Sequence, residues 1–181
     1  VMAYPFNGHW MDIGTITSFF EANIALAQPE PPFSLYSPKR PIYTRSRSLP
    51  PSRIIRSEIR DSLVVEGSDV TGAFISDSIV GVRSIIKRGT VLRDVVMLGA
   101  DFYENEEVLT DEDADKGLPE LGIGRSCVIE RAILDKNVRI GDNVVIRARP
   151  DVKEYKGELH WIVDGITIIP KGTVIPPGTT I

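Results

Sequence analysis

The chain has 181 residues, of which 42% are hydrophobic, and its formal net charge at pH 7 is -4. This composition can fill the core of one compact domain, and the acidic balance gives no reason to expect a nucleic-acid partner. No apolar run approaches the roughly 20 residues that a bilayer-spanning helix needs, so we expect no membrane partner and a soluble, intracellular protein. The single cysteine, Cys127, cannot form an internal disulfide, and we expect a buried structural thiol.

Residues 15–28 have the pattern of an amphipathic helix. Thr15 or Thr17 can cap its N-terminus, and Pro29 ends it. The apolar stripe consists of Phe19, Phe20, Ile24 and Leu26. Such a stripe must pack on a partner, and the short segment before it supplies little. We therefore predict that residues 1–28 are the end of another domain.

Residues 29–53 are rich in proline. This segment holds seven of the 13 prolines of the chain: Pro29, Pro31, Pro32, Pro38, Pro41, Pro50 and Pro51. Proline fixes the backbone in extended conformations, so the composition predicts a stiff, extended linker.

From residue 54 to residue 181, hydrophobic residues recur at every sixth position. Three registers are visible: Phe74, Val80, Ile86, Leu92 and Leu98; Leu134, Ile140 and Ile146; and Val163, Ile169, Ile175 and Ile181. Neither a helix nor an alternating strand has this period, which is typical of hexapeptide β-solenoids, where each hexad forms one flat side of a triangular coil. We expect the recurring residue to point into the coil, and the Gly, Asp or Asn near it to turn the corner at positive φ.

The predicted fold is therefore mainly β: a left-handed parallel β-helix over residues 54–181, preceded by one α-helix. A β-sandwich is the alternative, but it would need alternating strands and regular hairpin signals. The repeats are interrupted at residues 101–121 and 148–162. The first interruption is rich in acids, but it matches a calcium-binding loop only loosely, and we expect a solvated loop.

Few residues in the chain suggest catalysis. Hexapeptide acyltransferases use a histidine as general base, and the chain has only His9 and His160. His9 lies outside the repeats, and His160 stands beside Trp161 in the second interruption, where packing or surface exposure is the simpler interpretation. A Gly-rich phosphate loop, a zinc-binding spacing and a Ser-His-Asp set are also missing, so the residues do not predict a complete active site.

Several motifs together resemble one enzyme family. They are GHWMDIGT (8–15), FEAN (20–23), PIYT (41–44), LPPS (49–52), GADFYE (99–104), GIG (122–124), RAILDKN (131–137), RIGDNV (139–144) and GITIIPK (165–171). In this order they resemble the C-terminal part of the ADP-glucose pyrophosphorylases, of the cyanobacterial and plant-like type. The resemblance implies a cytoplasmic protein, or a plastid protein if the source is a plant.

The resemblance also implies an activity for the complete enzyme. This family converts ATP and glucose 1-phosphate into ADP-glucose and pyrophosphate, with Mg²⁺ held by two Asp residues, and Asp12 matches the second of them. The alternative role for Asp12 is to cap the helix that follows. The Gly-rich nucleotide loop, the first metal-binding Asp and the sugar-phosphate Lys of the family do not occur in this sequence, so we predict that the chain alone has no adenylyltransferase activity.

The resemblance further implies an allosteric site. Lys136 and Lys171 match the two lysines that bind the activator in this family, and Arg47 matches an arginine that helps to hold the anion. Arg45 replaces a family Gln and could add a second guanidinium. The expected effector is an anion such as 3-phosphoglycerate or phosphate, with fructose phosphates or pyruvate also possible. The alternative is that all four are ordinary solvated cations.

The resemblance implies a homo- or hetero-tetramer in which the β-helix contributes to subunit contacts. Two other functions stay open at this point. One is a non-catalytic β-solenoid that serves only oligomerisation, and the other is a hexapeptide acyltransferase.

Overall fold

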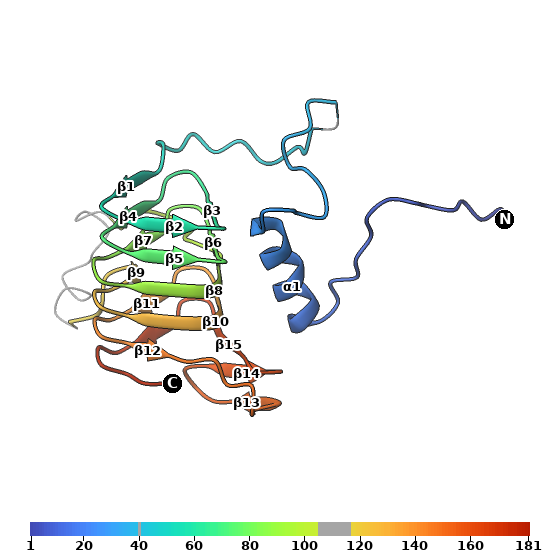
Figure 1. Cartoon of the computed structure of the whole chain (residues 1–181). Coiled ribbons are helices and arrows are strands. Elements are labelled where there is room, and N and C mark those ends of the chain that lie inside the picture. The colour runs from blue at the N-terminus through green and yellow to red at the C-terminus, as the bar shows by residue number, and fades with distance from the viewer. Residues whose placement is uncertain (40, 105–116) are drawn as a thin grey trace.

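The computed structural model describes residues 1–39, 41–104 and 117–181. Short strands wind into a solenoid whose coils are stacked in parallel, with one helix beside it and an extended N-terminal segment (Figure 1). The predicted solvated loop at residues 101–121 falls mostly on residues 105–116, outside the described residues. Among the described residues, we find no helix that is both long and apolar enough to cross a membrane.

Each coil of the solenoid has three sides. The first side consists of β1 (Arg53–Ile55), β4 (Asp69–Thr71), β7 (Ile85–Ile86), β9 (Gly122–Ile123), β11 (Arg139–Ile140) and β16 (Val174–Ile175). The second consists of β2 (Glu58–Arg60), β5 (Phe74–Ser76), the first halves of β8 (Val91–Met97) and β10 (Val128–Leu134), and β12 (Val145–Ile146). The third consists of β3 (Leu63–Val64), β6 (Ile79–Val80), the second halves of β8 and β10, and β15 (Ile166–Ile169). This arrangement confirms the predicted mainly β, parallel solenoid preceded by one helix.

The core consists of one ladder of aliphatic side chains from each side. The three ladders are Ile86, Ile123, Ile140 and Ile175; Ile75, Leu92, Ile129 and Ile146; and Val80, Met97, Leu134 and Ile169. All of these residues are at most 2% exposed. Stacking equivalent residues of successive coils buries a continuous core that no single coil could bury alone.

The predicted six-residue register is wrong at Phe74, Leu98 and Val163. Ile75 and Met97 take the inner positions, because a single corner residue at positive φ separates the second and third sides, as Asp94 does at φ 56°. Leu92 and Met97 are therefore five positions apart in the sequence, not six. Phe74 faces outward between the guanidinium groups of Arg60 and Arg93, which lie 5.7 and 5.4 Å from its ring centre.

The second interruption extends the third side. It contains β13 (Glu154–Lys156) and β14 (Trp161–Val163), which pair antiparallel with each other and with β15. Val163 pairs with Ile166 in this extension, so it lies outside the coil. Ile181 is half-buried and packs against the end of the core.

The helix α1 (Ile16–Ala27) begins at the predicted cap. The hydroxyl of Thr15 accepts a hydrogen bond from the amide of Ser18, and the hydroxyl of Ser18 accepts one from the amide of Thr15, at 3.1 Å each. This reciprocal pair is a capping box, which satisfies two amides that have no partner within the helix. Thr17 instead donates a hydrogen bond to Asp164, at 2.8 Å.

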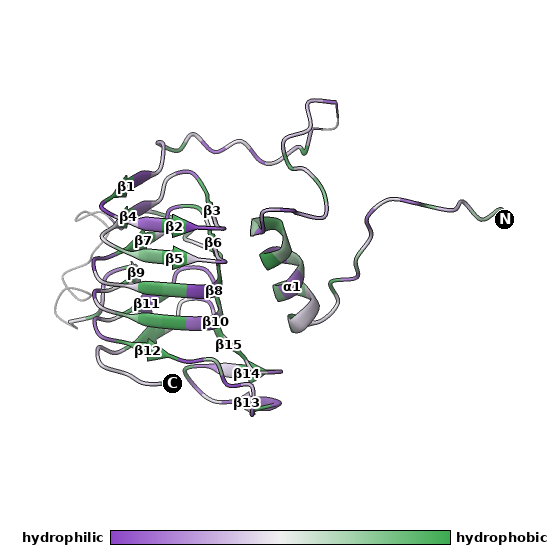
Figure 2. Cartoon of the chain, viewed as in Figure 1, coloured by the Kyte–Doolittle hydropathy of each residue, from purple (hydrophilic) through white to green (hydrophobic). Residues whose placement is uncertain are grey.

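The expectation that α1 has little to pack on within this chain is wrong. Phe20 is 2% exposed and lies against the outer surface of the third side, where Val96, Ile133, Ile166 and Ile168 surround it. These strands carry apolar residues on both faces, and Figure 2 shows β8 and β10 hydrophobic along most of their length. A strand that is apolar on both faces is typical of a sheet covered on both faces, and α1 is the outer cover.

Replacing Phe20 with alanine should release α1 from the solenoid. Truncating a buried Phe costs about 3–5 kcal/mol, and an undocked helix of 12 residues is marginal in water. Hydrogen exchange of the amides in residues 16–27 should therefore accelerate, while the core strands keep their protection. Phe6→Ala is the matched control, because Phe6 is 63% exposed. Unchanged exchange in the Phe20 variant would show that docking does not depend on this side chain.

The described part of residues 29–52 contains neither helix nor strand, and β1 begins at Arg53. The division into residues 1–28, 29–53 and 54–181 stays a prediction. Cys127 is fully buried, its Sγ donates a hydrogen bond to the carbonyl of Gly141 at 3.1 Å, and burial raises the pKa of its thiol. These features fit the expected structural thiol.

Candidate anion-binding site

Lys136 and Lys171 lie at the same corner of two successive coils. Leu134 pairs with Ile169 in the parallel register of β10 and β15, so the residue two positions after each occupies the same place in its own coil. The amide of Gly172 donates a hydrogen bond to the carbonyl of Lys136, at 2.9 Å, which holds the two corners together. The six-residue repeat thus brings together two lysines that are 35 positions apart in the sequence.

Asp101 approaches the same corner from the preceding coil. The chain turns at Gly99, where φ is 84° and an added Cβ would lie 2.1 Å from the carbonyl oxygen of Val82. Only glycine fits such a position without a shift of the backbone. The amide of Asn137 donates to the carbonyl of Gly99, at 3.1 Å, so the Gly99 turn and the Lys136 corner form one hydrogen-bonded unit.

The carboxylate of Asp101 binds both lysines. Its Oδ1 lies 2.6 Å from Nζ of Lys136, and its Oδ2 lies 2.8 Å from Nζ of Lys171. Asn137 adds two contacts: its Nδ2 donates to Oδ2 of Asp101 at 3.1 Å, and its Oδ1 accepts from the amide of Asp101 at 2.8 Å. The hydrogen bonds from Lys136 and then Lys171 hold the pKa of Asp101 far below its usual value, and Asp101 raises the pKa of Lys171. Asp101 and Lys171 are therefore both charged at neutral pH.

The two arginines of the linker lie beside this corner. Arg45 and Arg47 line a hollow of about 310 Å³ together with Lys136 and Asp101. Lys171 does not line the hollow itself, but it reaches the edge of the hollow through its ion pair with Asp101. The structure therefore brings all four predicted anion-binding residues to one place.

Arg83 is a further member of the cluster that the sequence analysis did not identify. It lines the same hollow, its Nη1 donates to the carbonyl of Ala100 at 3.3 Å, and its guanidinium lies 5.6 Å from the ring centre of Tyr103. The register of the repeats could have revealed it. Val80 pairs with Met97, and Met97 with Leu134, so the residues just after Val80 lie at the corner that carries Lys136.

The site therefore combines five basic side chains with one carboxylate. These residues are Arg45, Arg47, Arg83, Lys136, Lys171 and Asp101. Arginine offers paired N–H groups that match phosphate and carboxylate oxygens, and each lysine has N–H groups beyond the one that meets Asp101. The excess of positive charge and the concave shape suit an anion.

Comparison with known proteins gives a family for this chain. Residues 47–180 match the model of the GLGC left-handed parallel beta-helix domain. The chain belongs to this family. The matched family has a left-handed solenoid, as predicted. The matched residues of the GLGC domain include Arg47, Lys136 and Lys171.

One curated relative of the GLGC domain covers the whole chain. It is the glucose-1-phosphate adenylyltransferase small subunit, chloroplastic/amyloplastic, of Triticum aestivum, which is 42% identical over 186 aligned residues. The match covers 100% of this chain and 39% of the relative. These findings confirm the family resemblance that the motifs indicated. The chain spans about two fifths of the length of the relative it matches.

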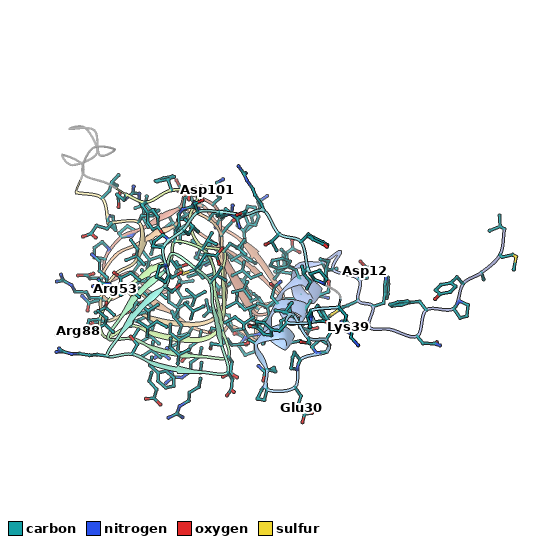
Figure 3. All side chains as sticks on the ribbon, turned by 90° about the horizontal axis from the view of Figure 1, so that it is seen from above. Asp12, Glu30, Lys39, Arg53, Arg88 and Asp101 are labelled. Atoms are coloured by element: carbon teal, nitrogen blue, oxygen red, sulfur yellow. The ribbon has the colours of Figure 1, made fainter. Side chains whose placement is uncertain are left out.

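Asp12 lies apart from the anion site of the GLGC domain. Figure 3 shows it next to α1, whereas Asp101 lies on the solenoid. Its Oδ1 accepts a hydrogen bond from the amide of Gly14 at 3.1 Å, and Thr15, not Asp12, caps α1. Within the described residues, no group of three or more His, Cys, Asp or Glu side chains could hold a metal ion. The role of Asp12 as a metal ligand stays a prediction.

Each of the two histidines lies beside an aromatic ring. The ring of His160 stacks on Tyr155 with 4.9 Å between the ring centres, and partial burial lowers its pKa. The ring of His9 lies 5.7 Å from that of Phe33. A general base for acyl transfer needs a histidine within reach of a substrate hydroxyl or amine, so neither residue supports the acyltransferase alternative.

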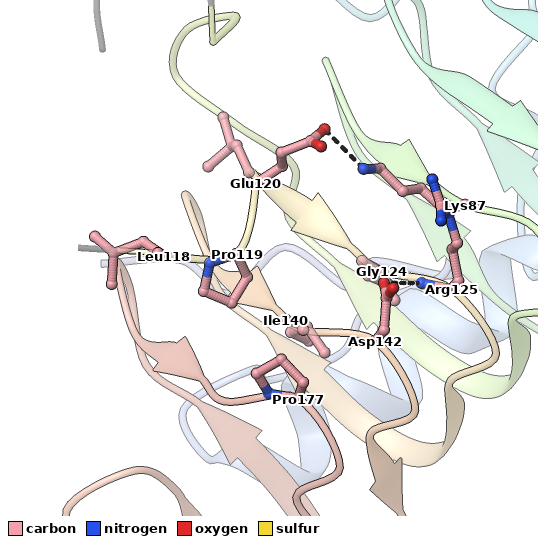
Figure 4. A pocket seen from close by; sticks show the side chains of 13 residues that line it. Lys87, Leu118, Pro119, Glu120, Gly124, Arg125, Ile140, Asp142 and Pro177 are labelled. Atoms are coloured by element: carbon pink, nitrogen blue, oxygen red, sulfur yellow. Dashed lines mark hydrogen bonds and ion pairs between the residues drawn. The ribbon is translucent and has the colours of Figure 1, made fainter. Parts of the chain in front are cut away.

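A second hollow lies on the first side of the GLGC domain, and Figure 4 shows its lining. Lys87 pairs with Glu120 at 2.7 Å, and Asp142 accepts a hydrogen bond from the amide of Arg125 at 2.7 Å. Two basic and two acidic side chains leave this hollow without net charge. It is therefore a weaker candidate for an anion than the cluster at Lys136.

Proposed function

We propose that this chain binds an anionic effector at Arg45, Arg47, Arg83, Lys136 and Lys171, as the regulatory part of a glucose-1-phosphate adenylyltransferase. One observation carries this proposal: two lysines of successive coils and two arginines of the linker converge on the same corner. The effector class expected from the family resemblance is a phosphorylated or carboxylated anion such as 3-phosphoglycerate or phosphate.

The proposed reaction of the complete enzyme is the transfer of an adenylyl group from ATP to glucose 1-phosphate, which gives ADP-glucose and pyrophosphate. The name of the Triticum aestivum relative and its 42% identity support this proposal. Mg²⁺ is the expected cofactor of that reaction. The chain alone is expected to be inactive, because the sequence motifs for nucleotide and sugar-phosphate binding are not among its residues.

The position of the site suggests how an effector acts. Arg45 and Arg47 belong to the segment that joins α1 to the solenoid, whereas Arg83 and Lys136 belong to the solenoid. An anion that contacts both groups would tie the linker to the solenoid. If the catalytic domain adopts two orientations, an effector that binds one of them better shifts the balance toward it.

Assembly is a second proposed role. Phe74, Val91, Val128 and Val145 form a register-matched column on the outer surface of the second side, and each is partly exposed. A solenoid side with such a column can pack on another subunit, which supports the tetramer expected from the family resemblance.

The full-length enzyme that contains this chain tests both proposals. Pyrophosphate release from glucose 1-phosphate should be fastest with ATP among the nucleoside triphosphates, and 3-phosphoglycerate or phosphate should change that rate. The same preparation should sediment as a tetramer. If the enzyme is active with ATP but neither anion alters its rate, the proposed reaction is supported and these two effectors are excluded. A monomeric active enzyme would contradict the assembly role.

A further inference from the structure

The carboxylate of Asp101 occupies the position that an external anion would take between the two lysines. One oxygen binds Lys136 and the other binds Lys171, at 2.6 and 2.8 Å. A phosphate or carboxylate ligand would bridge two ammonium groups in the same way, with one oxygen on each. Asp101 therefore satisfies from within the chain the same donors that an effector would use.

The carboxylate is held in this place by the fold. Asn137 binds both the side chain and the backbone amide of Asp101, at 3.1 and 2.8 Å. The chain reaches Asp101 through the turn at Gly99, where an added Cβ would lie 2.1 Å from the carbonyl oxygen of Val82. Flexible surface ion pairs lose much of their energy to the ordering of two long side chains. Here the acid is already ordered, so it competes for the lysines as a preformed group.

The remaining cations lie beside this carboxylate. Arg45, Arg47 and Arg83 line the hollow that Asp101 and Lys136 also line. An anion in the hollow would contact the arginines and meet the negative charge of Asp101 at its edge. It would then either displace the carboxylate from the lysines or share them with it at the cost of repulsion.

We propose that Asp101 is an internal competitor that lowers the affinity of the anion site and does so more strongly for ligands of higher charge. This inference rests on the proposed effector site. The repulsion between Asp101 and a bound ligand scales with the charge of the ligand. Removal of the charge of Asp101 should therefore increase the affinity for both kinds of anion. The fold-increase for a dianion should be about the square of the fold-increase for a monoanion.

The test compares sulfate, a dianion, with nitrate, a monoanion. Each is titrated at constant ionic strength into the 181-residue chain, and binding is followed by the NMR shifts of the backbone amides of Lys136 and Asn137. The variant Asp101→Asn keeps the shape of the side chain and removes its charge. Asp151→Asn is the matched control, because Asp151 is an exposed acid that pairs with Arg149, outside the cluster.

Asp101→Asn should bind sulfate about 10-fold and nitrate about 3-fold more tightly than the original chain, as expected for one partly screened charge. Asp151→Asn should change neither by more than about 2-fold. Asp101→Ser removes the charge and also changes the shape of the side chain. Its affinity should likewise increase more for sulfate than for nitrate. A purely structural effect of Asp101 would not depend on ligand charge.

Two results would overturn the inference, and they are distinguishable. If the original chain binds sulfate and both Asp101 variants bind it equally or more weakly, Asp101 is not a competitor, but the anion site stands. If neither the original chain nor either variant binds sulfate, the proposed site fails and the inference fails with it.

Discussion

Replacement of Lys171 with glutamate is expected to abolish effector activation in the full-length enzyme, with turnover in the absence of effector still measurable. The substitution removes one cation and places a second carboxylate beside Asp101, which lies 2.8 Å from the ammonium group in the original chain. Two adjacent acids repel each other and any incoming anion. We expect phosphate to bind the variant at least about 30-fold more weakly, because the substitution makes the charge of the site more negative by two units.

Two further variants separate the local effect from net charge. Lys171→Gln removes the positive charge without adding an acid, so its affinity for phosphate should lie between those of the original enzyme and Lys171→Glu. Lys153→Glu makes the same change in net charge at an exposed lysine in another part of the solenoid, and activation should persist there. Normal activation of the Lys171→Glu enzyme by 3-phosphoglycerate would show that Lys171 is not part of the site.

Replacement of Leu134 with alanine is expected to lower the free energy of unfolding by about 2–5 kcal/mol, the usual cost of a Leu→Ala substitution in a core. Leu134 is fully buried and lies between Met97 and Ile169 in the ladder of the third side. Its truncation leaves a cavity in contact with both neighbouring coils. Urea denaturation followed by circular dichroism measures the change.

Leu159→Ala is the control for this prediction, because Leu159 is 37% exposed in the turn between β13 and β14. It should change the free energy of unfolding by no more than about 0.5 kcal/mol, as is usual for surface positions. A Leu134 variant as stable as the original chain would mean that the ladders do not carry the stability of the solenoid.

The sequence predicted the period of the fold better than its exact register. Four residues of the predicted registers are buried in the core as expected: Ile86, Leu92, Ile140 and Ile169. They could be predicted because the inner position of each coil is filled by an aliphatic residue. Phe74 was misplaced because the six-residue pattern does not reveal that one residue, such as Asp94, can turn a corner alone. The docking of α1 was missed for a different reason: the six-residue pattern does not show that Val96 and Ile133 lie on the outside of the coil, where they pack with Phe20.

The residues of the anion site were also only partly predictable from the sequence. Lys136, Lys171 and Arg47 could be identified from motifs, and their convergence follows from the repeat once the register is known. The role of Asp101 could not be predicted, because its contact with two lysines depends on the turn at Gly99 and on Asn137, which are distant in the sequence from Lys171. Arg83 was missed because an arginine just after a strand is usually a solvated surface residue.

The most direct test of the anion site is a crystal structure of the chain with inorganic phosphate. We predict that phosphate lies in the hollow beside Asp101, in contact with Arg47 and Lys136. Phosphate bound instead at Lys87 and Arg125, in the hollow of Figure 4, or no phosphate at saturating concentration, would contradict an effector site at this corner of the solenoid.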